Sequence, residues 1–289
     1  MQRQISAADY AERALALGRT AKDAGNGVFR EDIPYGAHPM HKLDVLVPAG
    51  IESAKHGKPT KLPVVVLIHG GGFTQGSRKW NALMGPLLMS IPAILVSVGY
   101  RFMPEVEWPL PLDDCRLAFE WVLRNIDRFG GDARQVFVGG HSAGAALATL
   151  VALDPQTASQ RVAGVFALSG SFNRLAITGT AGSEPHLPAG PMPVDQNAPL
   201  AVPLVEKNRT AFLLAWGETE TQIQRVQHSS FALKEKLAQH QWPVEHFVVS
   251  GADHFEVHLA LADSSSPVSR QFANWMRRAS ELRKANEDE

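Results

Sequence analysis

Short apolar runs recur along most of the chain, and several of them end at glycine. Between them lie segments in which apolar residues recur every three or four positions, as in helices packed on a sheet. Runs of successive apolar residues must be covered on both faces, which favours a parallel sheet between two layers of helices. The expected strands are 64–68, 93–98, 136–138, 165–168, 211–216 and 244–249, and the expected helices are 112–126, 143–153, 223–240 and 268–282.

The N-terminal part of the chain adds a helix and two strands to this pattern. Ser6 and Asp9 resemble a capping box, so a helix is expected from Ser6 to about residue 24, and residues 1–30 are a candidate cap. Two strands are expected within 32–47, the second at 43–47 with a polar aspartate inside it. The pattern therefore predicts one α/β domain over 1–289, with a mostly parallel, doubly wound sheet and helices on both faces.

Residues 170–208 interrupt the alternation of strands and helices. This segment contains several glycines and six prolines: Pro185, Pro188, Pro191, Pro193, Pro199 and Pro203. A connection this long inside a compact domain is usually a functional loop. The sequence leaves two interpretations open, a lid over the site and a passive surface excursion.

Composition excludes several classes of protein. The 289 residues contain 28 Lys and Arg against 29 Asp and Glu, so no basic surface for nucleic acid is expected. One cysteine allows neither an intrachain disulfide nor a multi-cysteine zinc site. Charged residues interrupt the N-terminal apolar pattern, which argues against a signal peptide, and no run reaches the 18 apolar residues of a membrane span. A cytoplasmic protein without membrane or nucleic-acid partners is expected.

Gly140-His141-Ser142-Ala143-Gly144 lies between an expected strand and an expected helix. A nucleophile elbow requires this placement, because a tight turn there lifts a serine hydroxyl above the sheet edge. The flanking glycines avoid clashes in the turn, and the helix N-terminus favours developing negative charge. A glycine-rich loop that merely caps the helix is the alternative, but the strand–turn–helix context favours Ser142 as a nucleophile.

His69-Gly70-Gly71-Gly72 closes the expected strand at 64–68. Successive glycines allow backbone N–H groups to approach a substrate oxygen closely, and such a loop forms the oxyanion hole of lipases and esterases. We expect the N–H groups of Gly71, Gly72 and Ala143 to bind the oxyanion. His69 and Gly70 are expected to support the loop. Taken alone, this loop could also cradle a phosphate.

A serine nucleophile needs a base, and the base needs a carboxylate that orients it. His254, in the loop after the expected strand 244–249, is the candidate base. Glu218 and Glu220 both follow the strand 211–216. Glu220 is favoured because it lies nearer the middle of its loop, where a side chain can reach the histidine; Glu218 is the alternative acid.

Other polar residues have simpler interpretations. His254 and His258, with Glu256 between them, have the spacing of helical metal ligands, but the pattern is not H-E-x-x-H and no third ligand is evident. We therefore expect no metal and no cofactor. Cys115 is expected to pack in the core. Asp113 and Asp114 are expected to cap the helix that follows them.

Aromatic residues near these motifs are candidates for the substrate pocket, although core packing explains them equally well. The candidates are Phe73, Trp80, His141 and Phe255, with Phe102 and Trp108 nearby.

The motifs at 69–73 and 140–144, with Gly-Tyr-Arg at 99–101 and Asp-Asp-Cys at 113–115, resemble those of the hormone-sensitive-lipase-like esterases over about residues 30–280. The resemblance implies an α/β-hydrolase fold. Two details resemble kynurenine formamidase (arylformamidase): histidine rather than aspartate before the serine, and Asp-His-Phe-Glu at 253–256. The Gly-Glu-Thr-Glu-Thr loop also resembles the formamidase acid loop, although aspartate is the usual acid there. The third glycine and Phe73 are closer to esterases.

These observations predict a serine hydrolase that cleaves small carboxylic esters. The alternative substrate is an aryl formamide such as N-formylkynurenine. A non-catalytic binding protein on a hydrolase scaffold is the alternative from another class, but the chain keeps Ser142, a candidate acid and His254, which favours an enzyme.

Overall fold

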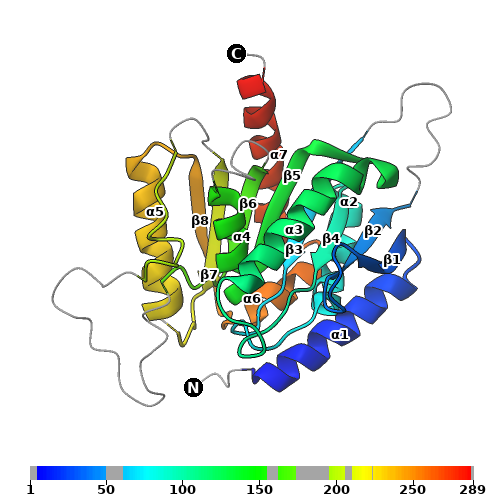
Figure 1. Ribbon diagram of the computed structural model, residues 1–289, viewed down its shortest axis with the longest axis horizontal. Coiled ribbons are helices and arrows are strands. Elements are labelled where there is room, and N and C mark those ends of the chain that lie inside the picture. The colour runs from blue at the N-terminus through cyan, green and yellow to red at the C-terminus, as the bar shows by residue number, and fades with distance from the viewer. Residues whose placement is uncertain are drawn as a thin grey trace.

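The computed structural model describes residues 5–49, 61–154, 162–173, 195–205, 210–222 and 224–287. In these ranges one sheet of eight strands runs through the molecule (Figure 1). Its order is β1-β2-β4-β3-β5-β6-β7-β8. The strands are β1 Gly27–Pro34, β2 Lys42–Pro48, β3 Leu62–Ile68, β4 Ile94–Val98, β5 Gly131–His141, β6 Val162–Leu168, β7 Ala211–Gly217 and β8 Val244–Val249.

The sheet is mostly parallel, as expected from the pattern. From β4 across to β8, every pair of neighbouring strands is parallel. The two early strands are antiparallel, β1 to β2 and β2 to β4. β4, β6 and β7 are entirely buried, which fits strands covered on both faces.

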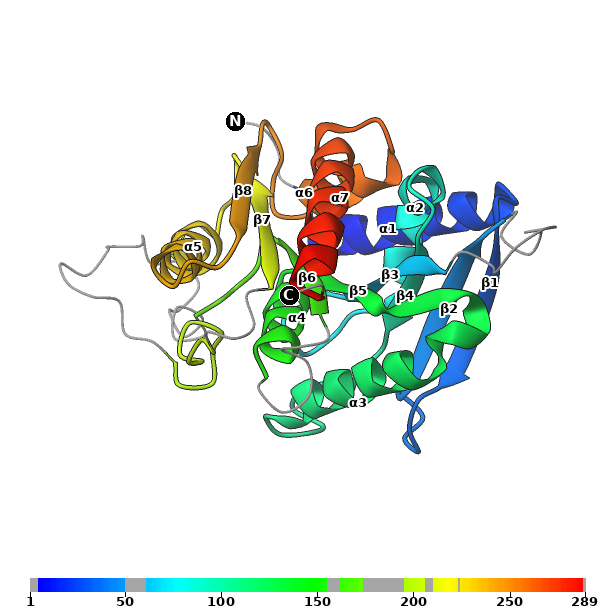
Figure 2. The ribbon, with the colours of Figure 1, turned by 90° about the horizontal axis from the view of Figure 1, so that it is seen from above.

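Helices cover both faces of the sheet (Figure 2). α3, α4 and α5 pack on one face, and α1, α2, α6 and α7 pack on the other, so the core has two apolar layers. The α-helices are α1 Ala7–Asp23, α2 Gly85–Ser90, α3 Leu110–Asn125, α4 Ala143–Leu153, α5 Ser229–Gln239, α6 Glu256–Leu259 and α7 Pro267–Glu287. Short 3-10 helices are η2 Arg78–Met84, η3 Ile126–Phe129 and η6 Ala260–Ala262, and Gln224–His228 is a π-helical turn, η5.

The two edge strands differ from the expectation. β1 begins at Gly27 rather than near Asp32, because its polar residues pair with β2 at a solvated edge where apolar alternation is weak. A bulge between Arg30 and Ile33 interrupts this pairing. β8 was expected to be covered on both faces, but it is an edge strand in which Glu245, His246 and Val248 are exposed.

Two helix predictions also need correction. α3 begins at Leu110, three residues before Asp113, so neither aspartate caps its N-terminus. Asp113 lies in the first turn and pairs with Arg116, whereas Asp114 is buried. The single helix expected over 223–240 is a π-helical turn followed by α5.

The segment 170–208, for which the sequence leaves a lid and a passive surface excursion open, lies largely outside the described residues, which omit 174–194 and 206–209. Its described parts are 170–173 and 195–205, and the second packs near α5, where Lys236 Nζ donates hydrogen bonds to the carbonyls of Leu200 and Val202. Both interpretations of this segment therefore stay predictions. No helix in the described ranges is both long enough and apolar enough to cross a bilayer.

Candidate active site

Ser142 occupies the sharp turn between β5 and α4, with φ 55° and ψ −121°. A positive φ is uncommon for a residue with a side chain and marks a turn held by its surroundings. A Cβ on Gly140 would lie 2.4 Å from the Ile68 carbonyl oxygen, and one on Gly144 would lie 2.0 Å from the same atom. Only glycine fits on either side of this turn, so the Gly-x-Ser-x-Gly pattern follows from contact with β3.

The structure brings Ser142, His254 and Glu220 into one hydrogen-bonded row. His254 Nε2 lies 3.0 Å from Ser142 Oγ, and His254 Nδ1 lies 2.8 Å from Glu220 Oε2. A carboxylate only accepts, so Nδ1 carries the proton and Nε2 is free to accept from the serine hydroxyl. His254 and Glu220 are both buried. This arrangement has the geometry of a serine nucleophile, a base and an orienting acid.

Glu218 lies outside this row. It is hydrogen-bonded to the N–H of Gly251 and the hydroxyl of Ser250, which lower the pKa of its carboxyl. Glu220, in contrast, has no more than 3% of its surface exposed and also accepts the Gln222 N–H through Oε1. Of the two carboxylates weighed from the sequence, only Glu220 is placed against the histidine.

The glycine loop after β3 has the conformation that its sequence requires. Gly71 has φ 119° and Gly72 has φ 64°, both in the region that favours glycine. A Cβ on Gly71 would lie 2.0 Å from the Gln75 carbonyl oxygen. Within the described residues, the N–H groups of Gly71, Gly72 and Ala143 have no backbone acceptor. They are therefore available to an oxygen in the cavity.

His69 supports this loop through hydrogen bonds and ring stacking. Its Nδ1 donates to the Gly70 carbonyl at 2.8 Å, and the Tyr100 hydroxyl donates to the His69 carbonyl at 3.1 Å. The His69 and Tyr100 rings stack with centroids 4.4 Å apart. Burial lowers the pKa of His69 to about 4, so it is neutral near pH 7. Gly70 is equally constrained, since a Cβ there would lie 2.8 Å from the His141 carbonyl oxygen.

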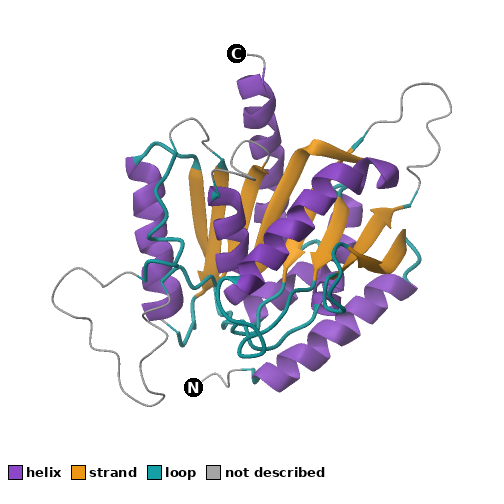
Figure 3. Cartoon of the chain, in the orientation of Figure 1, coloured by secondary structure: helices purple, strands orange, loops and turns teal. Residues whose placement is uncertain are grey.

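A cavity of about 520 Å³ opens over Ser142, at the sheet edge where the loops in the lower part of Figure 3 gather. Of the expected pocket residues, Trp80, His141 and Phe255 line it, whereas Phe73 does not. Phe73 is buried and packs edge-on against Trp108. The lining residues are Ala7, Ala8, Tyr10, Ala11, Gly71, Gly72, Thr74, Gln75, Trp80, His141, Ser142, Gln222, His254 and Phe255.

The N-terminal helix α1 forms one wall of this cavity, through three alanines and Tyr10. The sequence pattern marks Tyr10 only as part of an apolar helix face. Its ring stacks on Phe255 with centroids 4.7 Å apart, and its hydroxyl meets His258 Nδ1 at 2.9 Å. Tyr10 and His258 are 248 positions apart in the chain, and a contact at this separation leaves no local signal, which explains why the sequence did not identify Tyr10 as a pocket residue. Gln222 also lines the cavity and was not identified from the sequence.

The loop that carries His254 is held by a reciprocal set of hydrogen bonds. Asp253 Oδ1 accepts from the N–H groups of Phe255 and Glu256, and Glu256 Oε2 accepts from the Asp253 N–H, all within 3.0 Å. Asp253 Oδ2 accepts from the Ile5 N–H at 2.8 Å. Acidic residues on both sides of His254 therefore order its loop.

The buried carboxylate of Asp114 holds the Gly-Tyr-Arg segment. It accepts from the guanidinium and backbone N–H of Arg101 and lies 2.9 Å from His41 Nε2. Burial alone would raise the pKa of Asp114, but the hydrogen bonds from Arg101 outweigh it and lower that pKa. The Asp-Asp-Cys motif thus joins two segments of the core.

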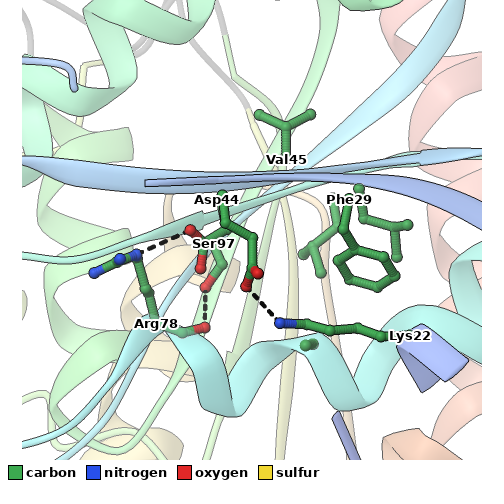
Figure 4. Close-up of a pocket in the computed structure, with 10 residues that line it drawn as sticks. Lys22, Phe29, Asp44, Val45, Arg78 and Ser97 are labelled. Atoms are coloured by element: carbon green, nitrogen blue, oxygen red, sulfur yellow. Dashed lines mark hydrogen bonds and ion pairs between the residues drawn. The ribbon is translucent and has the colours of Figure 1, made fainter. Parts of the chain in front are cut away.

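A second cavity, of about 10 Å³, lies between α1, β2 and η2 (Figure 4). Asp44 accepts from Arg78 Nε and pairs with Lys79 Nζ, each at 3.0 Å, and Ser97 Oγ donates to the Arg78 carbonyl. This space holds one water at most. The polar Asp44 in β2 is therefore part of an ion-pair group. The space beside it offers no room for a substrate.

In the described structure, His254 and His258 do not come together with a third potential metal ligand. His258 is hydrogen-bonded to Tyr10, and Glu256 is hydrogen-bonded to Asp253. No group of three potential metal ligands is present among the described residues. Cys115 is buried in the core, and burial raises the pKa of its thiol.

Comparison with known proteins shows the fold family of this chain. A family model described as alpha/beta hydrolase fold matches residues 65–257. Esterase LipC of Mycobacterium tuberculosis is 36% identical over 137 residues, 45% of this chain and 32% of that protein. A probable isoprenylcysteine alpha-carbonyl methylesterase of Arabidopsis thaliana, ICMEL2, is 29% identical over 154 residues, 50% of this chain and 35% of that protein. The chain therefore spans about a third of the length of these relatives.

Solved structures show the same fold over nearly the whole chain. Esterase B from Lactobacillus rhamnosis has a TM-score of 0.71 at 19% identity, over 97% of this chain and 96% of that one. Esterase LipW from Mycobacterium marinum has a TM-score of 0.70 at 21% identity, over 96% and 91%. The resemblance to hormone-sensitive-lipase-like esterases is confirmed, while the closer resemblance to kynurenine formamidase stays a prediction. The family model matches more than half of the sequence, and the chain belongs to the alpha/beta hydrolase fold family.

Proposed function

We propose that this protein is a serine hydrolase that cleaves small carboxylic esters through an acyl-enzyme. The observation that carries the proposal is the row Ser142–His254–Glu220, with contacts of 3.0 and 2.8 Å, in which Ser142 and His254 line a cavity. The esterases among the relatives support the same reaction class. No cofactor takes part in this mechanism.

In the first half of the reaction, Ser142 Oγ attacks the ester carbonyl carbon while His254 Nε2 accepts the hydroxyl proton. Glu220 holds the imidazole in the required tautomer and stabilises its cation. The tetrahedral intermediate then collapses, the carbon–oxygen bond to the alcohol breaks, and His254 delivers its proton to the leaving alkoxide. The acyl group remains on Ser142.

In the second half, water attacks the acyl carbon while His254 Nε2 accepts one of its protons. The bond between the acyl carbon and Ser142 Oγ then breaks, His254 returns the proton to Ser142 Oγ, and the carboxylic acid is released. In both halves the negative charge develops on the carbonyl oxygen. The N–H groups of Gly71, Gly72 and Ala143 are proposed to bind this oxyanion, and one such donor is typically worth about 3 kcal/mol of the barrier. Helix α4 begins at Ala143, so its positive end faces the same charge.

The cavity fits a small substrate with an apolar or aromatic part. Tyr10, Trp80 and Phe255 present aromatic rings, and the alanines of α1 leave space between them. An aryl formamide is the second candidate substrate, because its ring matches this wall and because residues 253–256 resemble the formamidase motif. We propose the same catalytic residues for either substrate.

A turnover assay tests the proposal. Short-chain p-nitrophenyl esters and N-formylkynurenine would be compared for wild type, Ser142→Ala and a control, Ser265→Ala, at an exposed serine. We expect Ser142→Ala to lower kcat by at least about 10⁴-fold and the control to match wild type. If kcat/KM were much higher for N-formylkynurenine than for the esters, the substrate would be an aryl formamide and not an ester. Substantial activity in Ser142→Ala would overturn the proposed mechanism.

A further inference from the structure

His141, the residue directly before Ser142, contacts the loop that carries the base. Its Nε2 lies 2.7 Å from the backbone carbonyl oxygen of His254, across 113 positions of the chain. A carbonyl oxygen only accepts, so His141 Nε2 carries a proton and donates it. Its ring lies 4.8 Å from the His254 ring, centroid to centroid.

The surroundings fix the orientation of this imidazole. Only 2% of His141 is exposed, and its ring stacks on His258 with centroids 5.4 Å apart and planes 11° apart. Its Nδ1 is buried and has no hydrogen-bond partner among the described residues. The bond to His254 is therefore the one hydrogen bond that this ring makes in the described structure, and it is directed at the catalytic loop rather than at the fold in general.

From this geometry we infer that His141 is a positioning residue for catalysis, which ties the serine turn to the histidine loop through its Nε2–H bond to the His254 carbonyl. The inference rests on the proposed function, because it assigns a role relative to Ser142 and His254. The serine follows His141 directly, so one side chain fixes both members of the 3.0 Å Ser142–His254 contact relative to each other. A misplacement of about 1 Å in such a contact can cost about 100-fold in rate.

The charge state of His141 suits this role. Burial is the main cause that lowers its pKa well below the usual range, and the neighbouring His254 and His258 add to that effect. A neutral His141 can still donate through Nε2 without opposing the positive charge that His254 acquires during the reaction. Burial also lowers the pKa of His258 to about 4, so the second neighbouring ring is neutral as well.

Two substitutions separate the hydrogen bond from the packing of the ring. His141→Gln removes the ring but keeps an N–H donor at a similar reach, whereas His141→Phe keeps a ring against His258 but removes the donor. His240→Phe is the matched control, because His240 Nδ1 makes a 2.8 Å bond to the Lys236 carbonyl at an exposed position that does not line the cavity. Each variant would be assayed for kcat, KM, melting temperature and rate of labelling by a fluorophosphonate, with Ser142→Ala alongside.

We expect His141→Phe to lower kcat and the labelling rate about 10- to 100-fold with little change in KM, and His141→Gln to stay within about threefold of wild type. If His141→Phe is as active as His141→Gln or more active, the ring and not the bond matters, and the inference is wrong. If His141→Phe does not fold, the folded His141→Gln variant is the test: a fall in its kcat of more than tenfold would overturn the inference. Activity in Ser142→Ala would instead overturn the proposed function.

Discussion

The hydroxyl oxygen of Tyr10 lies 2.9 Å from Nδ1 of His258, which joins the N-terminal helix to the helix after the histidine loop. Burial raises the pKa of Tyr10, so its hydroxyl keeps its proton and donates to the neutral His258 ring. Because Tyr10 also lines the cavity, α1 both anchors this loop and forms part of the substrate wall.

We predict that Tyr10→Phe lowers the free energy of unfolding by about 1–3 kcal/mol, because it leaves a buried ring nitrogen of His258 without a donor. The aromatic wall of the cavity is kept, so turnover of short esters should stay within a few fold of wild type. Urea unfolding monitored by circular dichroism measures the change. Tyr10→Leu, which also loses the ring contact with Phe255, should be less stable still. Equal stability of Tyr10→Phe and wild type would contradict this account of the α1 contact.

The two carboxylates after β7 provide a matched pair. Glu220→Gln should lower kcat by about 10²- to 10⁴-fold, because an amide that presents its NH₂ to His254 no longer holds the reactive tautomer. Glu218→Gln should remain near wild type, since Glu218 is bonded to Ser250 and Gly251 outside the row. Steady-state kinetics on one p-nitrophenyl ester checks both. If kcat fell more in Glu218→Gln than in Glu220→Gln, the acid role would belong to Glu218.

Gly71→Ala should disrupt the glycine loop, because the added Cβ would meet the Gln75 carbonyl oxygen at 2.0 Å with a φ of 119°. The backbone must shift, and we expect kcat to fall at least about 100-fold as oxyanion donors move. Gly25→Ala is the control, since its φ is also positive, at 69°, but nothing lies within 4 Å of the added Cβ. It should lower the melting temperature slightly and leave kcat unchanged. Normal kcat in Gly71→Ala would exclude this loop from catalysis.

Stability should depend on pH through the buried histidines. His69 and His258 have folded-state pKa values of about 4, below the unfolded value of about 6.5, so the unfolded chain binds more protons between these values. Their contribution is fully present above pH 6.5 and is lost as the pH falls toward 4. Each should add a slope of up to about 1.4 kcal/mol per pH unit in that window.

Urea unfolding at several pH values between 4.5 and 7.5 measures this slope. His258→Gln should flatten it, because one of the buried histidines with a lowered pKa is removed. A control, His240→Gln, removes an exposed histidine and should leave the slope as in wild type. If stability were constant or rose as the pH fell through this window, the buried histidines would not be neutral in the folded protein.

The strands of the sheet centre could be predicted because burial on both faces leaves uninterrupted apolar runs, as in β3. The two edge strands differ in this respect. The strand at 244–249 was predicted with the bounds of β8, but its apolar run suggested cover on both faces, whereas Glu245, His246 and Val248 are exposed. The start of β1 could not be predicted, because its polar residues Arg30, Glu31 and Asp32 give no apolar alternation and its pairing depends on β2.

In the candidate site, too, some residues could be predicted from the sequence and others could not. Ser142 and the glycines beside it are identifiable because their turn imposes local constraints that few residues satisfy. Glu220 was favoured from the sequence because it lies nearer the middle of its loop, and its Oε2 lies 2.8 Å from His254 Nδ1. Tyr10 and Asp114 contact partners far away in the chain, and their surrounding residues give no sign of those partners.

The most direct measurement of the central claim is the mass of the protein after reaction with a fluorophosphonate, followed by peptide mapping. A nucleophilic serine activated by a histidine forms a stable covalent adduct with such a reagent. We predict one adduct, on the peptide that contains Ser142, with labelling lost in Ser142→Ala and slowed at least about 100-fold in His254→Ala. An adduct on another residue, or equal labelling in His254→Ala, would contradict the proposed serine–histidine mechanism.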